Sequence, residues 1–383
     1  MRAMQSALAG IVVVLLVGCA GINPRYPAPP PDFAADQVSF DWHHYLAEGW
    51  QPGDGAVRLR PAQDEQRVFA AHVTGEVVAL SKVDGRVLWK HTLEPWQVGV
   101  TLYRDQLYLL SQKGDLVVLN ANDGAEVQRS PLGVSAIAPL VVSGNQVAFL
   151  SQDGKLRLWD NTSRNWVWIY DSEQPVLTLH GQAQPVFYRD SIIAGFSNGR
   201  VMALDLLSGE PRWSHRLSNP RGVTDLQRLV DVDVTPLVIN DRLYVAAYEG
   251  RLVEIMATSG EIRWETAKSV SASLATDGRS LFVANRTGEI FAYDLNTKAI
   301  RWQQQAVTGR PLTSLAVQGD TVIVTDRRGY VYGFSTQTGE PVGRLNFAGH
   351  QRFTVPAIVD ADHFYVQSMQ GLLLGGSIRA QQE

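Results

Sequence analysis

Residues 199–214 read GRVMALDLLSGEPRWS, in which glycine turns bracket a run of apolar residues. Gly199 comes before the apolar run, Ser208 and Gly209 form a turn signal, and Trp213 follows near the end. Apolar runs bounded by turn residues are typical of β-strands joined by tight turns. We therefore expect two consecutive antiparallel strands, with the Ser-Gly turn between them.

The same pattern occurs eight times along the chain. Successive copies are separated by 39, 40, 45, 51, 38, 41 and 42 residues, a period typical of repeat architectures. A tryptophan lies fourteen residues past the glycine in five of the seven complete copies, and Gln128 and Gly343 take its place in the other two. The copies begin at Gly75, Gly114, Gly154, Gly199, Gly250, Gly288, Gly329 and, for the partial one, Gly371, and the tryptophans are Trp89, Trp168, Trp213, Trp264 and Trp302.

Two further strands precede each copy, so the repeating unit has four strands. In residues 234–267, for example, VTPLVIN, RLYVAAY, RLVEIMA and EIRWETA are separated by turn residues. One such sheet cannot bury both of its faces, so neighbours must cover them and a closed ring must protect the edges. The sequence therefore predicts an all-β fold, an eight-bladed β-propeller of four-stranded antiparallel blades over residues 38–379.

The eighth copy ends before its fourth strand. The N-terminal stretch VSFDWHHYLAEG, residues 38–49, supplies a matching strand with Trp42 in the tryptophan position. We expect residues near 38–47 to complete the last blade beside residues 371–379. The repeat tryptophans are interpreted as packing between blades and not as surfaces for sugar or base stacking.

The first residues, MRAMQSALAGIVVVLLVGC, form a candidate targeting segment. The apolar run from Leu8 to Val17 is ten residues long, too short to span a bilayer but suited to a signal peptide, here residues 1–18. Leu16 to Cys19 resemble the bacterial lipobox, which implies that Cys19 is lipidated, and Ala20 is compatible with sorting to the outer membrane. Residues 19–37 are rich in proline and read as a tether, and residues 380–383 as a tail.

Composition limits the classes of function. Of the 383 residues, 45% are hydrophobic and 19% are charged, with a net charge of −4, which suits a globular chain and argues against nucleic acid as a partner. The eight histidines show no zinc-like spacing, and Cys19 is the only cysteine. No catalytic residue, metal ligand or cofactor site is predicted from local motifs, although a Ser-His-Asp triad assembled from distant blades stays open.

Two repeat spacings, 45 and 51 residues, are longer than the rest. The extra residues fall in EQPVLTLHGQAQP, residues 173–185, and SNPRGVTDLQRLVDVDVTP, residues 218–236. Insertions in a rigid repeat must leave it as loops, where function concentrates, and adjacent blades should place these two near each other. Leu177 and Leu179 alternate around Thr178, which favours a partner site if they are exposed and ordinary packing if they point into the blade.

The second insertion ends in Asp-Val-Asp-Val. In an extended chain Asp231 and Asp233 point one way, and Val232 and Val234 point the other way. The two carboxylates could contact a partner, complete a turn, pair with Arg221 or Arg228, or bind calcium. Calcium needs six or more oxygen ligands, and no local loop supplies them.

The repeat resembles that of the quinoprotein dehydrogenases, eight-bladed periplasmic enzymes that use pyrroloquinoline quinone and calcium. The resemblance implies an enzyme as one alternative. Members of that group typically have adjacent cysteines stacked over the quinone, and this chain has no cysteine after Cys19.

The lipobox, the eight repeats, LTLHGQAQP (177–185) and TDLQRLVDVDVTP (224–236) together resemble the BamB family, lipoproteins of the outer-membrane β-barrel assembly machinery. The resemblance implies a non-enzymatic scaffold without a cofactor, anchored in the outer membrane and facing the periplasm. It also implies that the two insertions contact the periplasmic POTRA region of BamA.

By motif match to that family, Leu177 and Leu179 are the apolar anchors and Asp231 and Asp233 the acidic contacts. Arg228 is a candidate for orienting the loop. His180 stands where the best-known members carry arginine, which implies a pH-dependent contact. A further alternative is that exposed blade edges pair directly with unfolded outer-membrane protein clients by β-augmentation.

Overall fold

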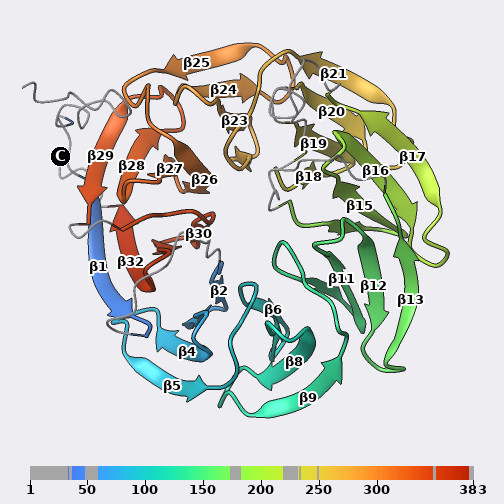
Figure 1. Ribbon diagram of the computed structural model, residues 1–383. Coiled ribbons are helices and arrows are strands. Elements are labelled where there is room, and N and C mark those ends of the chain that lie inside the picture. Colours follow the sequence, from blue (N-terminus) through green and yellow to red (C-terminus); the bar gives the residue numbers. More distant parts are fainter. Residues whose placement is uncertain are drawn as a thin grey trace, which may run out of the picture.

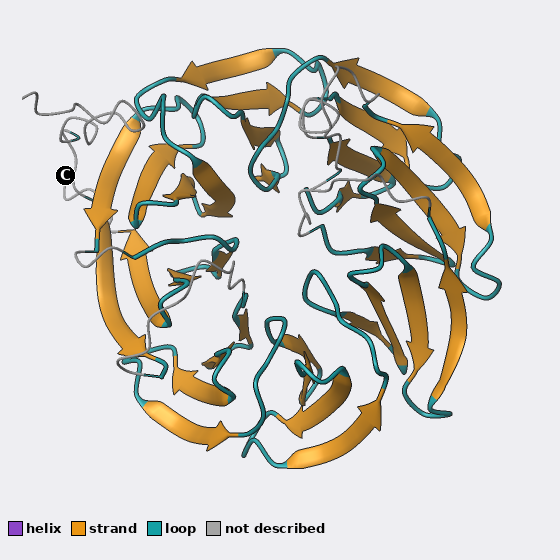
Figure 2. Cartoon of the chain, in the orientation of Figure 1, coloured by secondary structure: helices purple, strands orange, loops and turns teal. Residues whose placement is uncertain are grey.

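The computed structural model describes residues 33, 37–47, 59–172, 183–218, 232, 234–247, 250–347 and 351–378. Within these ranges the chain forms eight four-stranded antiparallel sheets arranged around a ring (Figure 1). Figure 2 shows strands and loops only, and none of the described residues is helical. The predicted eight-bladed propeller is therefore confirmed.

Within each blade the first strand lies nearest the axis and the fourth lies at the rim. Blades 1 and 2 are β2 Ala62–Gln63, β3 Arg67–Ala71, β4 Glu76–Ser81, β5 Val87–Thr92, and β6 Thr101–Tyr103, β7 Gln106–Leu110, β8 Asp115–Asn120, β9 Glu126–Pro131. Blades 3 and 4 are β10 Val141–Ser143, β11 Gln146–Leu150, β12 Leu156–Asp160, β13 Asn165–Tyr170, and β14 Val186–Tyr188, β15 Ser191–Gly195, β16 Arg200–Asp205, β17 Pro211–Arg216. Blades 5 and 6 are β18 Leu237–Ile239, β19 Arg242–Ala246, β20 Leu252–Met256, β21 Ile262–Thr266, and β22 Ala275–Thr276, β23 Ser280–Ala284, β24 Ile290–Asp294, β25 Ile300–Gln304. Blades 7 and 8 are β26 Leu312–Gln318, β27 Thr321–Asp326, β28 Tyr330–Ser335, β29 Pro341–Asn346, and β30 Ile358–Val359, β31 His363–Gln367, β32 Leu372–Ile378, β1 Val38–Tyr45.

The antiparallel order within a blade gives the ring two distinct faces. One face carries the turns between the first and second strands and between the third and fourth strands, and we call it the turn face. The other carries the second-to-third turns and the connections from one blade to the next, and we call it the connection face. The glycine that opens each sequence repeat lies in the second-to-third turn, on the connection face.

Gly75 illustrates why this position is glycine. Its φ is +101°, and a Cβ added there would lie 2.5 Å from the carbonyl oxygen of Leu93. The Leu93 N–H donates to the Gly75 carbonyl at 2.9 Å. A residue with a side chain would be strained in this conformation. It would also displace Leu93, the residue that follows β5 and is bonded to this turn.

The repeat tryptophans join neighbouring blades. Trp213, on the fourth strand of blade 4, donates its Nε1–H to the Ala257 carbonyl of blade 5 at 3.0 Å. Its indole lies on Gly260, where an added Cβ would be 2.6 Å from Trp213 Cγ. The bond is repeated at 2.8–3.0 Å by the pairs Trp42–Lys82, Trp89–Ala121, Trp168–Leu206 and Trp302–Thr336. Trp264 instead packs against Tyr293, with ring centroids 5.4 Å apart. The interpretation of these residues as packing between blades is confirmed.

The two repeats without tryptophan have local reasons. Gln128 donates from Nε2 to Asn161 Oδ1 of the next blade at 2.8 Å, and the turn it meets has Arg164, at φ +55°, in place of glycine. An indole at position 128 would therefore find no glycine to pack on, and the Gln128 amide makes the hydrogen bond to the next blade instead. At Gly343, an added Cβ would lie 2.6 Å from the Val38 N atom, because the incoming N-terminal strand occupies that space.

The ring closes by pairing the two ends of the described chain. β1 runs antiparallel to β32, with Val38 opposite Ile378 and Tyr45 opposite Leu372. Trp42, only 6% exposed, then docks onto blade 1 through the Lys82 carbonyl. The predicted closure of the last blade by residues near 38–47 is confirmed.

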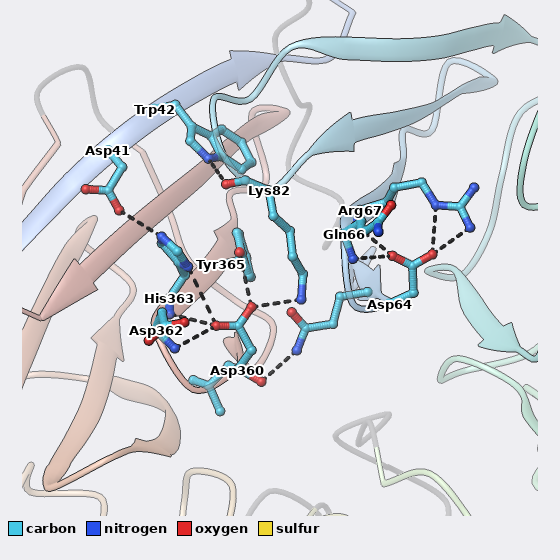
Figure 3. A network of polar contacts seen from close by, with 12 residues as sticks. Asp41, Trp42, Asp64, Gln66, Arg67, Lys82, Asp360, Asp362, His363 and Tyr365 are labelled. Carbon is cyan, nitrogen blue, oxygen red and sulfur yellow. Dashed lines mark hydrogen bonds and ion pairs between the residues drawn. The ribbon is translucent and has the colours of Figure 1, made fainter.

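Polar contacts reinforce this seam (Figure 3). Lys82 Nζ of blade 1 lies 2.8 Å from Asp360 Oδ2 of blade 8, and the Tyr365 hydroxyl donates to the same oxygen at 3.3 Å. Burial opposes ionisation of Asp360, but the Lys82 ammonium and backbone N–H donors outweigh it and lower the pKa of that carboxyl. The seam is therefore held by a salt bridge as well as by the Trp42 indole contact.

Two histidines at the seam are held neutral. His72 is buried in the second-to-third turn of blade 1, and His44 is partly buried on β1. Burial lowers the pKa of each imidazole below its ordinary 6.5, although the Glu76 carboxylate partly opposes this. Burial therefore opposes protonation of both imidazole rings in acidic solution.

Replacing Trp42 with alanine should lower the free energy of unfolding by about 3–5 kcal/mol, because a buried indole is lost and a cavity is left at the seam. Urea denaturation followed by circular dichroism measures the change. Leu207→Ala is the control, since Leu207 is 81% exposed and should cost less than about 0.5 kcal/mol. Equal losses in the two variants would contradict the role of Trp42 in closure.

Acidification should destabilise the ring through His44 and His72. The pKa values of both imidazoles are lower in the folded chain, so the unfolded chain binds more protons as the pH falls below about 7. The stability that the neutral histidines allow above pH 6.5 is therefore lost as the pH falls below 6.5. Unfolding by urea at pH 7.5 and 5.5 should show a smaller loss in the His44→Gln, His72→Gln double variant. Leu207→Ala, at an exposed residue that does not titrate, is the control and should leave the pH dependence as it is. An unchanged dependence in the double variant would refute this assignment.

Candidate functional site

The residues predicted to form the partner site lie outside the described ranges. The structure describes the ends of both insertions, which are Ser172 and Ala183 for the first, and Ser218, Val232 and the chain from Val234 for the second. The undescribed candidates are Leu177, Leu179, His180, Arg228, Asp231 and Asp233, together with the lipidation candidate Cys19. The described part of the site therefore consists of the positions that anchor the two insertions.

Both insertions leave the ring on the same face. The first connects β13, the fourth strand of blade 3, to β14, the first strand of blade 4. The second connects β17 of blade 4 to β18 of blade 5 in the same way. Each is an enlarged connection between neighbouring blades, so the described ends of both lie on the connection face, one blade apart.

The returning ends of the two insertions are hydrogen-bonded to each other. The Gln184 backbone N–H donates to Thr235 Oγ1 at 3.0 Å, and the Gln184 side chain donates from Nε2 to the Pro139 carbonyl at 3.1 Å. These contacts join blades 3, 4 and 5 at one point. The expected proximity of the two insertions holds for their described ends.

The leaving ends are fixed to the repeat glycines. Ser172 Oγ donates to the Gly154 carbonyl at 3.1 Å, and the Leu217 N–H donates to the Gly199 carbonyl at 2.8 Å. All four ends of the insertions are therefore held by the body of the ring.

The valines of the Asp-Val-Asp-Val segment face the core. Val232, 3% exposed, packs in the apolar layer between blades 4 and 5, and Val234, 5% exposed, packs between blades 5 and 6. The Val232 N–H donates to the Phe196 carbonyl at 3.3 Å. Gly195 makes room for Val232, because an added Cβ would collide with the valine side chain. Both valines are buried, in the layers on the two sides of blade 5. Asp231 and Asp233, which we expect to point the other way, lie outside the described residues.

The described residues contain neither a candidate metal centre nor a membrane-spanning helix. No cluster of three or more histidine, cysteine or acidic side chains is arranged there to hold a metal ion. Within the same residues, no helix is long and apolar enough to cross a membrane. Half-buried Lys155 pairs with exposed Asp171 beside the exit of the first insertion, with Nζ 2.8 Å from Oδ2.

Sequence analysis missed the residue that joins the root of the insertions to the far side of the ring. Arg60, at the start of blade 1, donates from Nη1 to Gln184 Oε1 at 3.2 Å. The repeat gave no distinctive signal for Arg60, because another arginine, Arg310, stands at the same distance before the first strand of blade 7.

Comparison with known proteins identifies the relationship. A family profile described as outer membrane protein assembly factor BamB matches residues 42–115 and 73–304. The protein of that name from Pseudomonas aeruginosa is 31% identical, over 96% of this chain and 97% of its own length. The one from Shewanella oneidensis is 28% identical, over 95% and 96%. The crystal structure of BamB from Moraxella catarrhalis, at 24% identity, has the same fold, with a TM-score of 0.78 over 89% of this chain and 99% of that one.

The bond between Gln184 and Thr235 should matter to stability. Thr235→Val removes the hydroxyl with almost no change in shape and leaves the Gln184 N–H without its acceptor, which should cost about 1–3 kcal/mol. Thr235→Ser keeps the hydroxyl and should cost less. Urea denaturation of the two variants makes the comparison, and a loss in Thr235→Val no larger than that in Thr235→Ser would contradict the importance of the hydrogen bond.

Proposed function

The chain belongs to the family of the outer membrane protein assembly factor BamB, and from this premise we propose that it is a non-enzymatic scaffold of the outer-membrane β-barrel assembly complex. It binds the periplasmic POTRA region of BamA and so assists the folding and insertion of outer-membrane proteins. The observation that supports this is the common root of the two long insertions, where Gln184 and Thr235 are bonded on one face of the ring.

The proposed contact surface has an apolar and an acidic part. Leu177 and Leu179 supply the apolar anchors, and Asp231 and Asp233 supply the acidic contacts. The burial of Val232 supports the acidic part, because alternation along an extended segment directs the side chains on either side of a buried one toward the solvent. Apolar anchors at the centre with charges at the rim are the usual anatomy of a protein interface.

Arg228 and His180 have secondary roles in this proposal. Arg228 orients the second insertion by pairing with one of the two aspartates. His180 replaces a permanent charge with a group that titrates near neutrality, so the contact weakens or strengthens with pH.

The membrane anchor sets the affinity that is needed. Signal peptide cleavage leaves Cys19 as the lipidated first residue of an outer-membrane protein that faces the periplasm, and residues 19–37 act as the tether. Confinement to the same membrane surface as BamA raises the effective concentration, so a modest direct affinity is sufficient. The absence of any cysteine after Cys19 favours this scaffold over a quinoprotein dehydrogenase.

A second candidate function is the direct binding of client strands. On β13, the fourth strand of blade 3, Val167 and Ile169 are exposed, and no described strand pairs with its outer edge. The residues of β13 include no charged side chain, whereas charges are a common protection of edge strands. An extended segment of an unfolded outer-membrane protein could add to this edge.

Leu177→Glu combined with Asp233→Arg should abolish partner binding, because one change places a charge at the apolar anchor and the other reverses an acidic contact. The amount of BamA that co-purifies from detergent-solubilised membranes should fall at least about tenfold, while circular dichroism stays native.

The matched control carries the same substitutions on the turn face, Leu207→Glu with Asp105→Arg, at two exposed positions. This variant should retain BamA. Retention of BamA by the insertion variant would mean that the docking surface lies elsewhere. Loss of BamA in the control would mean that the effect is not specific to the insertions.

A further inference from the structure

One ring of equivalent positions lies at the inner end of the eight blades. Each position comes two residues before the first-strand residue that pairs with a second-strand residue seven positions further along the chain, as Ala62 pairs with Phe69 and Ala316 with Ile323. Because the first strands lie nearest the axis in Figure 1, these residues begin the innermost layer of the ring. The eight residues are Arg60, Gly99, Pro139, Gln184, Thr235, Ser273, Ser314 and Pro356.

Arg60 is the one charged member, and its side chain reaches past two blades. Its Nη1 donates to Gln184 Oε1 at 3.2 Å, a bond from blade 1 to blade 4. The equivalent residues of the blades between them are Gly99 and Pro139, whose short side chains leave the path open. Since blades 1 and 4 are not neighbours, the guanidinium must lie inside the ring, toward the axis.

The backbone of Arg60 is held so that the side chain keeps this direction. The Val100 N–H donates to the Arg60 carbonyl at 3.1 Å. A Cβ added to Gly99 would collide with the backbone N and O atoms of Arg60, so a larger residue at 99 would displace the arginine. The glycine of blade 2 is therefore part of what positions Arg60.

The charge of Arg60 has no counter-charge among the described residues. Its side chain donates there only to a neutral amide oxygen, and its Nε is buried with no hydrogen-bond partner. Burial lowers the pKa of the Arg60 guanidinium, and no nearby carboxylate opposes this. The group nevertheless stays protonated, because arginine does not lose its proton in proteins.

Other enclosed arginines in this ring are paired. Arg310 Nη1 lies 2.9 Å from Asp326 Oδ2, and Arg157 Nη2 lies 2.6 Å from Asp153 Oδ2. A buried charge without a partner is costly, whereas a buried charge with an anion is tolerated. Arg60 thus differs from Arg310 and Arg157, each of which forms a salt bridge within the ring.

We propose that the axial region of the ring binds a small oxyanion, a carboxylate or phosphate group, on the guanidinium of Arg60. The planar fork of N–H donors matches the oxygen spacing of both groups. Arg60 keeps partial solvent exposure, so an anion in solution can reach it. This site is independent of the proposed docking function, since it requires neither insertion to contact a partner.

The anion would also support the root of the insertions. Gln184 accepts from Arg60 through its side chain and donates to Thr235 through its backbone. Neutralising Arg60 therefore stabilises a chain of contacts that runs from blade 1 to blade 5.

Phosphorus NMR and thermal denaturation of the full-length chain in non-ionic detergent test the site, with inorganic phosphate as the probe and ionic strength fixed with sodium chloride. Phosphate should broaden its own resonance in a saturable way and raise the melting temperature. Arg60→Gln should weaken binding at least tenfold and remove the thermal shift, and Arg60→Lys should bind with intermediate strength.

Arg263→Gln is the matched control, because Arg263 is an exposed arginine on an outer strand. It should bind phosphate as the unmodified chain does. A parallel titration with acetate, followed by the thermal shift, distinguishes the two chemistries, and a response to either that depends on Arg60 supports the proposal.

Three outcomes would overturn the proposal. Equal phosphate binding by the unmodified chain and Arg60→Gln would indicate an adventitious ion only. No Arg60-dependent response to either phosphate or acetate would leave Arg60 as a structural brace between blades 1 and 4. Equal loss of binding in Arg263→Gln would indicate a diffuse effect of net charge.

Discussion

An indole N–H that reaches the backbone of the neighbouring blade is the contact on which this ring depends. A propeller blade has two apolar faces and cannot be stable alone, so the joints between blades carry the fold. Here the tryptophan of one fourth strand lies on a turn glycine of the next blade and donates to a carbonyl beside it, as Trp213 does with Gly260 and Ala257. Each such joint combines burial of a large ring with a satisfied polar group.

The repeat made the fold predictable, because a period of about 40 residues and a fixed tryptophan position leave few architectures open. Even the closing strand could be found, since Trp42 preserves the pattern at the other end of the chain. The reasons for Gln128 and Gly343 could not be found in this way. They depend on Arg164 and on the N-terminal strand, which meet those positions only in the folded ring.

The candidate site shows the same division. Alternation predicted only that Val232 and Val234 point away from Asp231 and Asp233, and the burial of both valines became evident in the folded ring. The bond from Gln184 to Thr235 and the long reach of Arg60 were beyond sequence reasoning, because they join three blades through side chains whose spacing along the chain has no periodic signature. The described ends of the insertions therefore lie where a side chain from the non-adjacent blade 1 reaches them.

The pairing of β1 with β32 has a consequence for biosynthesis. Contacts such as that of Ser39 with Ser377 join residues 338 positions apart. Forming them costs the loop-closure entropy of almost the whole ring, so they are expected to form late in folding. β1 is synthesised before every other strand of the ring and β32 after them, so the ring cannot close until β32 has emerged from the ribosome. A truncated product would keep an open sheet edge accessible to proteases, so closure also acts as a check that the chain is complete.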